Sequence, residues 1–344
     1  MADADSPGDK PDSRLSEPAG ALAESSSEGA ARGKARWSWV ATPLKLAFGL
    51  GLLAYLILSG RLGLTAFGDA HIGWDLVAAA ALIVGALFPM CVRWWLLLRY
   101  QGIEVKFRRA VEMTWIGYFF GLFLPGAVSG DLARGYYIIK DTPHARSRAA
   151  STIILDRGLG LYSLFFIGLV AAAVLHARGQ TTPMIRAMTV CTVILVGSMT
   201  AALVLLWLPR SRRWLLGLLP SRLRAELDAG LGDYCTQAAS IAVCFAVSLA
   251  ASLLNVLAFL PAARVLGEQL PALSIFLAGP LIILANSLPI SPGGLGVAES
   301  ASDALLHAFG FGHGAEVMLL LRGVIVVSAL PGAVLYAMHA RRAK

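Results

Sequence analysis

Charged side chains in apolar surroundings are the feature of this sequence best suited to chemistry. The set comprises Asp131, Arg134, Asp156, Arg157, Glu299, Asp303 and Arg322. Ionisable groups inside apolar segments are costly unless they are paired, and they commonly serve a function. Guanidinium groups suit a phosphate, whereas carboxylates suit a cationic group or the transfer of a proton. We therefore treat these seven residues as candidate substrate-binding residues, and we assign no catalytic residue.

Two proline- and glycine-containing breaks precede most of these charges. The first, "FLPGAVSGDLARGYY", predicts that one helix ends near Leu124 and another starts near Ser129 or Asp131. The second, "NSLPISPGGLGVAES", predicts a helix end near Ser287 and a new start near Gly294. Free N–H groups at such helix starts favour an anion, for which a phosphate is the natural candidate in a membrane. The breaking residues are Pro125, Gly130, Pro289, Pro292, Gly293, Gly294 and Gly296.

Purely structural roles for the charged residues are the alternative. Asp131 is also suited to cap a helix, and it shares a helix face with Arg134 at i, i+3. Asp156 and Arg157 would alternatively form a buried ion pair between the first hairpin and the next span. Arg93 lies beside two tryptophans, and we interpret it as an interfacial anchor.

The composition predicts an integral membrane protein. Hydrophobic residues make up 57% of the 344 positions and charged residues 15%, whereas soluble domains have about 45–50% and about 25%. The net charge of +8 comes from basic residues spread between apolar stretches, so we expect no nucleic-acid partner. The histidines and cysteines form no metal-binding motif, and we expect neither a metal nor a cofactor.

Six apolar stretches are long enough to span a membrane. We place them at about 40–60, 74–98, 151–176, 184–208, 238–263 and 316–340. Two broken segments, at about 110–140 and 271–309, stand between them. Residues 1–36 have the composition of a disordered cytoplasmic tail, and residues 37–344 form the membrane domain. A basic amphipathic connector at about 210–235 is expected to lie along the membrane interface.

The distribution of basic residues predicts the orientation. Basic loops after the second span and after the first broken segment, with a basic C-terminus, indicate that both termini are cytoplasmic. Each broken segment must then enter and leave on one side, as a re-entrant hairpin. The halves, about 40–176 and 184–340, would form an inverted repeat, as in many secondary transporters. Pro125 and Pro289 correspond at an offset of 164 residues (289 minus 125), and the same shift brings two spans onto two others.

The sequence also resembles a known family, the lysylphosphatidylglycerol synthase transmembrane region, which is also described as flippase-like. The stretches "RWWLLLRYQGI", "FLPGAVSGDLARGYYI", "TIILDRGLGL" and "LPISPGGLGVAES" carry the resemblance, which covers about residues 40–340. The matching motif residues are Pro125, Gly130, Asp131, Arg134, Asp156, Arg157, Pro292, Gly293, Gly294, Gly296 and Glu299. The family pattern has Glu before Arg in the middle motif, where this chain has Asp156.

The resemblance implies movement of a lipid between leaflets. In two-part synthases the membrane portion moves aminoacylated phosphatidylglycerol that a soluble domain makes. This chain ends at Lys344, just after the last span, so we expect no aminoacyl-transfer activity and no enzyme. We expect an all-α polytopic protein of the inner or plasma membrane that moves a phospholipid or a lipid-linked anionic headgroup. A membrane enzyme, or an accessory partner of an envelope-lipid synthesis protein, is the alternative.

Overall fold

The computed structural model describes residues 50–51, 53–58, 73–123, 129–208, 217 and 238–342. Every regular element within these ranges is a helix. The predicted tail at 1–36, Pro125, most of the span at 40–60 and all of the connector at 210–235 except Gly217 lie outside the described residues.

Five of the six predicted spans are confirmed as helices long and apolar enough to cross a membrane. Three of them are single helices in the middle of the chain: α2 (Trp74–Tyr100), α5 (Arg146–Ala177) and α6 (Pro183–Trp207). In the fourth, α9 (Ala238–Leu257) continues into α10 (Phe259–Val265). The fifth, α13 (Gly314–Arg342), ends the described part of the chain.

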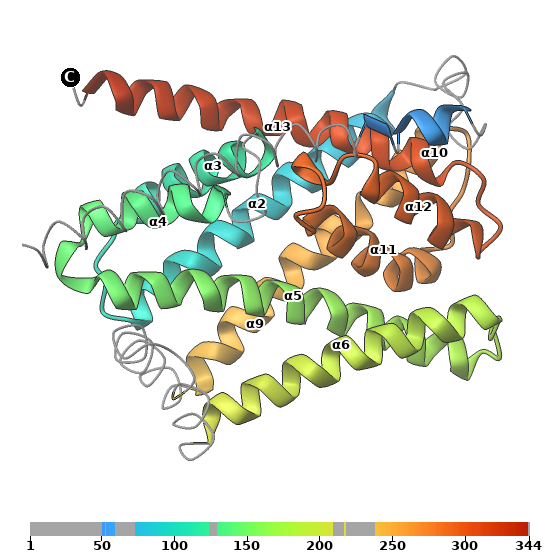
Figure 1. Cartoon of the computed structure of the whole chain (residues 1–344), viewed down its shortest axis with the longest axis horizontal. Coiled ribbons are helices and arrows are strands. Elements are labelled where there is room, and N and C mark those ends of the chain that lie inside the picture. The colour runs from blue at the N-terminus through green and yellow to red at the C-terminus, as the bar shows by residue number, and fades with distance from the viewer. Residues whose placement is uncertain are drawn as a thin grey trace, which may run out of the picture. The chain divides into compact units, whose positions relative to one another are not determined.

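Two helix pairs occupy the predicted broken segments, and Figure 1 shows the partners of each pair side by side. The first pair is α3 (Phe107–Phe123) and α4 (Ser129–Asp141). The second is α11 (Ala272–Ser287) and α12 (Val297–His307), with a short 3-10 turn, η3 (Pro292–Gly294), between them. A re-entrant course of these pairs through the membrane stays a prediction.

The second new helix begins three residues later than we predicted. Gly293, Gly294 and Gly296 have φ angles of 58°, 70° and 77°, which lie in the left-handed region. A right-handed helix needs negative φ, so α12 begins only after the last of these glycines. Gly294 also leaves no room for a side chain, because a Cβ there would lie 2.4 Å from the Asn286 carbonyl oxygen.

The element order repeats at the offset of 164 residues. Shifted by this number, the bounds of α3 become 271–287, and α11 covers Ala272–Ser287. The bounds of α5 become 310–341, and α13 covers Gly314–Arg342. The packing repeats as well, because α3 contacts α13 and α5 contacts α11. The opposite membrane orientation of the two halves, which would make the repeat inverted, stays a prediction.

Close backbone approaches hold the first helix pair together. A Cβ on Gly130 of α4 would lie 2.3 Å from the Gly117 carbonyl oxygen of α3 and 3.1 Å from Gly121 Cα. Only glycine fits at this crossing, and small residues are the usual means by which membrane helices approach closely. The first residues of α4, including Asp131, are thereby fixed against α3.

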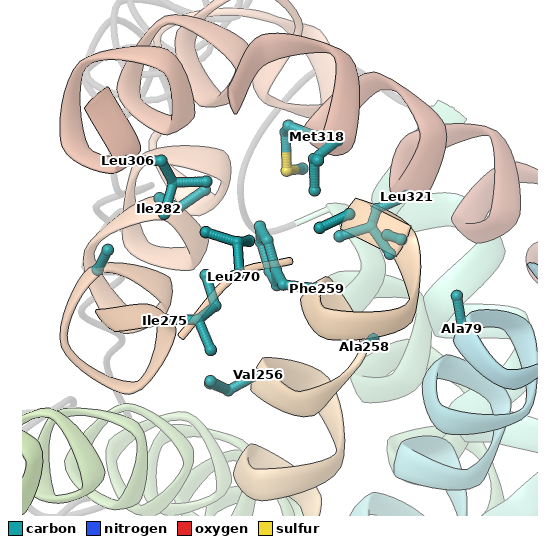
Figure 2. Close-up of a cluster of buried hydrophobic side chains, with 14 of the residues drawn as sticks. Ala79, Val256, Ala258, Phe259, Leu270, Ile275, Ile282, Leu306, Met318 and Leu321 are labelled. Atoms are coloured by element: carbon teal, nitrogen blue, oxygen red, sulfur yellow. The ribbon is translucent and has the colours of Figure 1, made fainter. Parts of the chain in front are cut away.

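An apolar core fixes the second helix pair. Figure 2 shows five side chains converging: Phe259 of α10, Leu270 just before α11, Ile282 of α11, Leu306 of α12 and Met318 of α13. All five are less than a tenth exposed. This packing fixes α11 and α12, between which the second break lies.

Candidate functional site

The described helices enclose a cavity of about 340 Å³. Its walls come from α3, α4 and α11 and from four of the long helices, and both breaks reach it, through Gly130 and through Pro289 and Gly293. Leu87 of α2 and Ser252 of α9 line it, and both lie near the middle of their helices. The cavity therefore lies at about half the length of the membrane-spanning helices.

Asp156 of α5 is the centre of a buried charge cluster at one side of this cavity. Arg93 Nε of α2 donates to Asp156 Oδ1 at 2.7 Å, and Arg134 Nη1 of α4 donates to Asp156 Oδ2 at 3.1 Å. Arg93 Nη1 also donates to Ser248 Oγ of α9 at 3.1 Å. Arg93, Arg134 and Asp156 are at most 5% exposed. The interpretation of Arg93 as an interfacial anchor is therefore wrong, because the buried carboxylate of Asp156 on α5 binds its guanidinium group.

Asp131 and Arg157 form the second pair of this cluster. Arg157 Nε and Nη2 donate to the two Asp131 carboxylate oxygens at 2.6 and 2.9 Å, a bidentate geometry. Asp131 is buried, whereas the Arg157 side chain is half exposed and lines the cavity. Arg134 Nη1 lies 3.7 Å from Asp131 Oδ1, so the two pairs form one network.

The cluster holds one more positive charge than negative charges. It holds three arginines, Arg93, Arg134 and Arg157, against two aspartates, Asp131 and Asp156. The excess centres on Arg134, whose Nε and Nη2 are buried without a hydrogen-bond acceptor among the described residues. Its guanidinium carbon lies 4.2 Å from the centre of the Trp94 ring, a cation–π contact that stabilises the charge only partly. Arg134 also lines the cavity.

Arg322 and Glu299 form a separate buried pair behind the second break. Arg322 Nε and Nη2 donate to the two Glu299 carboxylate oxygens at 2.5 and 3.1 Å. The same guanidinium donates to the Gly293 and Gly294 carbonyl oxygens at 2.5 and 3.1 Å, and to Asn286 Oδ1 at 3.3 Å. Neither Arg322 nor Glu299 lines the cavity, so this pair holds the turn that does.

Glu299 has a second contact that fixes the start of α12. Its Oε2 accepts a hydrogen bond from the Gly296 backbone N–H at 2.8 Å, and its side chain is fully buried. The N-terminus of α12 is thereby capped by the protein's own carboxylate.

The two bidentate pairs occupy corresponding places in the repeat. In each, an acid from the first turn of the second hairpin helix binds an arginine of the next long helix, over 26 residues for Asp131–Arg157 and 23 for Glu299–Arg322. The likeness ends there, because Arg157 of the first pair lines the cavity, whereas neither member of the second pair does.

The structure thus brings some of the predicted site residues together near the cavity and places others away from it. Asp131, Arg134, Asp156 and Arg157 come together, whereas Asp303 is buried on α12 beside Gly314 and does not line the cavity. The breaking residues Gly130, Pro289, Gly293 and Gly294 line the cavity; Pro292 begins η3 and Gly296 precedes α12.

Several cavity-lining polar residues were missed by sequence reasoning. They are Ser252 and Asn255 of α9 and Asn286 at the end of α11. Ser248, Ser252 and Asn255 follow one another at intervals of four and three residues in a largely apolar helix, which places them on one face. This spacing could have predicted a polar face on this helix from the sequence alone. In the part of the chain that the structure describes, no three His, Cys, Asp or Glu side chains cluster as metal ligands would.

The fold and the site define a polytopic α-helical membrane protein with a charged cavity at mid-length of its spans. The chain belongs to the family of the lysylphosphatidylglycerol synthase TM region, whose family model matches residues 43–332. This confirms the resemblance found in the sequence. No curated protein and no solved structure gives a significant match to the chain.

Proposed function

We propose that this protein moves a lipid with an anionic headgroup between the leaflets of the membrane. The observation that carries the proposal is the buried excess positive charge at Arg134, which lines a cavity at mid-length of the spanning helices. A buried guanidinium with two free donor nitrogens is costly unless an anion accepts from it. A phosphodiester supplies one negative charge and acceptor oxygens, and it is the commonest anion of membrane lipids.

The helix breaks suit this role. Irregular backbone at membrane depth is tolerated where protein or a water-filled cavity satisfies its polar groups. At the second break, Arg322 satisfies the carbonyl oxygens of Gly293 and Gly294 from behind, so the turn can border a polar cavity. We assign Arg322 and Glu299 to this positioning role, and the binding of the anion to Arg134 with Arg157.

Alternating access follows from the repeat in this proposal. The two helix pairs would enter from opposite faces, and each would open the cavity toward its own side. We place the protein in the inner or plasma membrane with both termini cytoplasmic, and we assign it a transport role and not a catalytic one. A lipid supplied by an envelope-lipid synthesis protein is a natural substrate for such a site.

The experiment is reconstitution into liposomes that carry a labelled anionic phospholipid, with the rate of label movement between leaflets as the readout. Arg134→Gln is the informative variant, because it leaves two arginines against two aspartates and so balances the buried charge. Arg108→Gln is the matched control, since Arg108 is 89% exposed on α3. We expect movement with wild type and with Arg108→Gln, and a loss of about tenfold or more with Arg134→Gln.

The same experiment can refute the proposal. Label movement that equals the protein-free rate in liposomes containing correctly folded wild type would contradict it. Equal rates for wild type and Arg134→Gln would contradict the assignment of the anion to Arg134. Monodisperse elution of each variant in detergent establishes that it is folded.

A further inference from the structure

The cavity has a second, uncharged side, and from it we infer the chemistry of the headgroup. We propose that the site selects a phosphodiester lipid whose headgroup ends in a neutral polyol, and that it rejects headgroups with an amine. This inference rests on the proposed function and deepens it. It names the substrate class of the same cavity.

The cationic side binds the phosphodiester. Arg93, Arg134 and Arg157 line the cavity there, and one positive charge remains after Asp131 and Asp156 are counted. A single excess charge matches the single negative charge of a phosphodiester.

The face of α9 leads from this cationic side to the uncharged side. Ser248 accepts from Arg93, and Ser252, one turn further, hydrogen-bonds Ser163 at 2.8 Å. Asn255 follows after three more residues and lines the cavity together with Ser252. Seven residues separate Ser248 from Asn255, which is about 10 Å along a helix. A headgroup of a phosphate and a short polyol is suited to span this distance.

Two uncharged lining residues, Asn255 and Asn286, offer both kinds of hydrogen-bonding partner that hydroxyl groups need. Asn255 Nδ2 donates to the Ala251 carbonyl oxygen at 3.0 Å, and its Oδ1 has no donor among the described residues. Asn286 Oδ1 accepts from Arg322, which leaves its amide N–H groups without an acceptor in the described part of the chain. One hydroxyl of a polyol can donate to the first amide, and another can accept from the second.

The described lining holds no carboxylate that could bind an ammonium group. Asp156 is the one acidic residue among the described residues that line the cavity, and each of its oxygens accepts from an arginine. The phosphodiester already balances the one excess positive charge, so an ammonium group next to three arginines without a free carboxylate would be buried with no counter-charge. Such an arrangement costs far more than an unused hydrogen bond, so the site discriminates by charge.

The test measures lipid binding to the purified protein by native mass spectrometry, with four lipid probes of equal acyl chains. Phosphatidylglycerol carries an anionic phosphodiester with a polyol, and phosphatidic acid has the phosphate alone. Phosphatidylethanolamine and lysyl-phosphatidylglycerol carry amines. The variants are Asn255→Leu, which keeps the side-chain size, Arg134→Gln, and Ser198→Ala on the exposed face of α6 as the control.

We expect phosphatidylglycerol to bind most tightly. Asn255→Leu should weaken its binding about threefold to tenfold and leave phosphatidic acid unchanged, since only the polyol loses a hydrogen bond. Arg134→Gln should weaken both anionic lipids, and Ser198→Ala neither. If an amine-bearing lipid binds as tightly as phosphatidylglycerol, or if Asn255→Leu changes both anionic lipids equally or neither, the inference is overturned. If Arg134→Gln leaves both anionic lipids bound as in wild type, the proposed function itself fails.

Discussion

Removing the charge of Glu299 should destabilise the protein far more than removing a surface charge. The Glu299 side chain is fully buried and that of Arg322 is 10% exposed, and two hydrogen bonds of 2.5 and 3.1 Å join them. Glu299→Gln keeps the size of the side chain but leaves the guanidinium without a counter-charge. Breaking one partner of a buried pair costs about 3–5 kcal/mol. Glutamine also has one acceptor oxygen where glutamate has two, so it cannot accept from both Gly296 N–H and the guanidinium as Glu299 does.

The assay is reversible unfolding in mixed micelles, which gives the free energy of unfolding for wild type, Glu299→Gln and a control. Arg108→Gln is the control, because Arg108 is 89% exposed and pairs with Glu112 at 3.3 Å on the surface. Such pairs contribute about 0–1 kcal/mol. The double variant Glu299→Gln, Arg322→Gln should recover part of the loss, since no lone charge then remains buried. If Glu299→Gln costs no more than the control, the pair does not hold the second break and our reasoning about it is wrong.

Three further outcomes follow from the packing, the charges and the orientation. Gly130→Ala should lower the free energy of unfolding by about 1–3 kcal/mol, because its Cβ would lie 2.3 Å from a backbone oxygen. Gly158→Ala is the control and should not destabilise the protein, because its Cβ would have nothing within 4 Å. Thermal unfolding in detergent compares the two variants. Asp156→Asn should lower the free energy of unfolding by about 3–5 kcal/mol, since it leaves two buried arginines without their carboxylate. A loss below about 1 kcal/mol would contradict the assignment of Asp156 as the centre of the charge cluster. In a cysteine-free background, a cysteine at Gln180 should react with an impermeant thiol reagent in intact cells and one at Lys106 should not; the reverse pattern would refute the predicted orientation.

The sequence predicted the helices well because apolar length and helix-breaking residues are local signals. Five spans and both interrupted segments lie where hydrophobicity, proline and glycine indicated. The late start of α12 was missed, since the positive φ angles of Gly293, Gly294 and Gly296 depend on tertiary packing, such as the contact of Gly294 with Asn286.

The pairing of charges was harder to predict than their importance. Sequence spacing paired Asp131 with Arg134, yet the tighter partner of Asp131 is Arg157, and Asp156 binds Arg93 and Arg134. Adjacent residues on a helix point in different directions, so Asp156 and Arg157 each face a different neighbour. Arg93 was misread because its tryptophan neighbours are typical of an interface, and only the crossing of α2 with α5 brings it to a carboxylate.

The central claim is that an anionic headgroup binds in the cavity where both breaks meet. Its most direct test is cross-linking with a phosphatidylglycerol whose headgroup carries a photoactivatable group, followed by mass spectrometry of the adducts. We predict adducts on residues 114–122 of α3 and 283–288 around the end of α11, which line the cavity, and their loss in Arg134→Gln. Adducts confined to the exposed surface of α6, and equal in wild type and Arg134→Gln, would contradict the account.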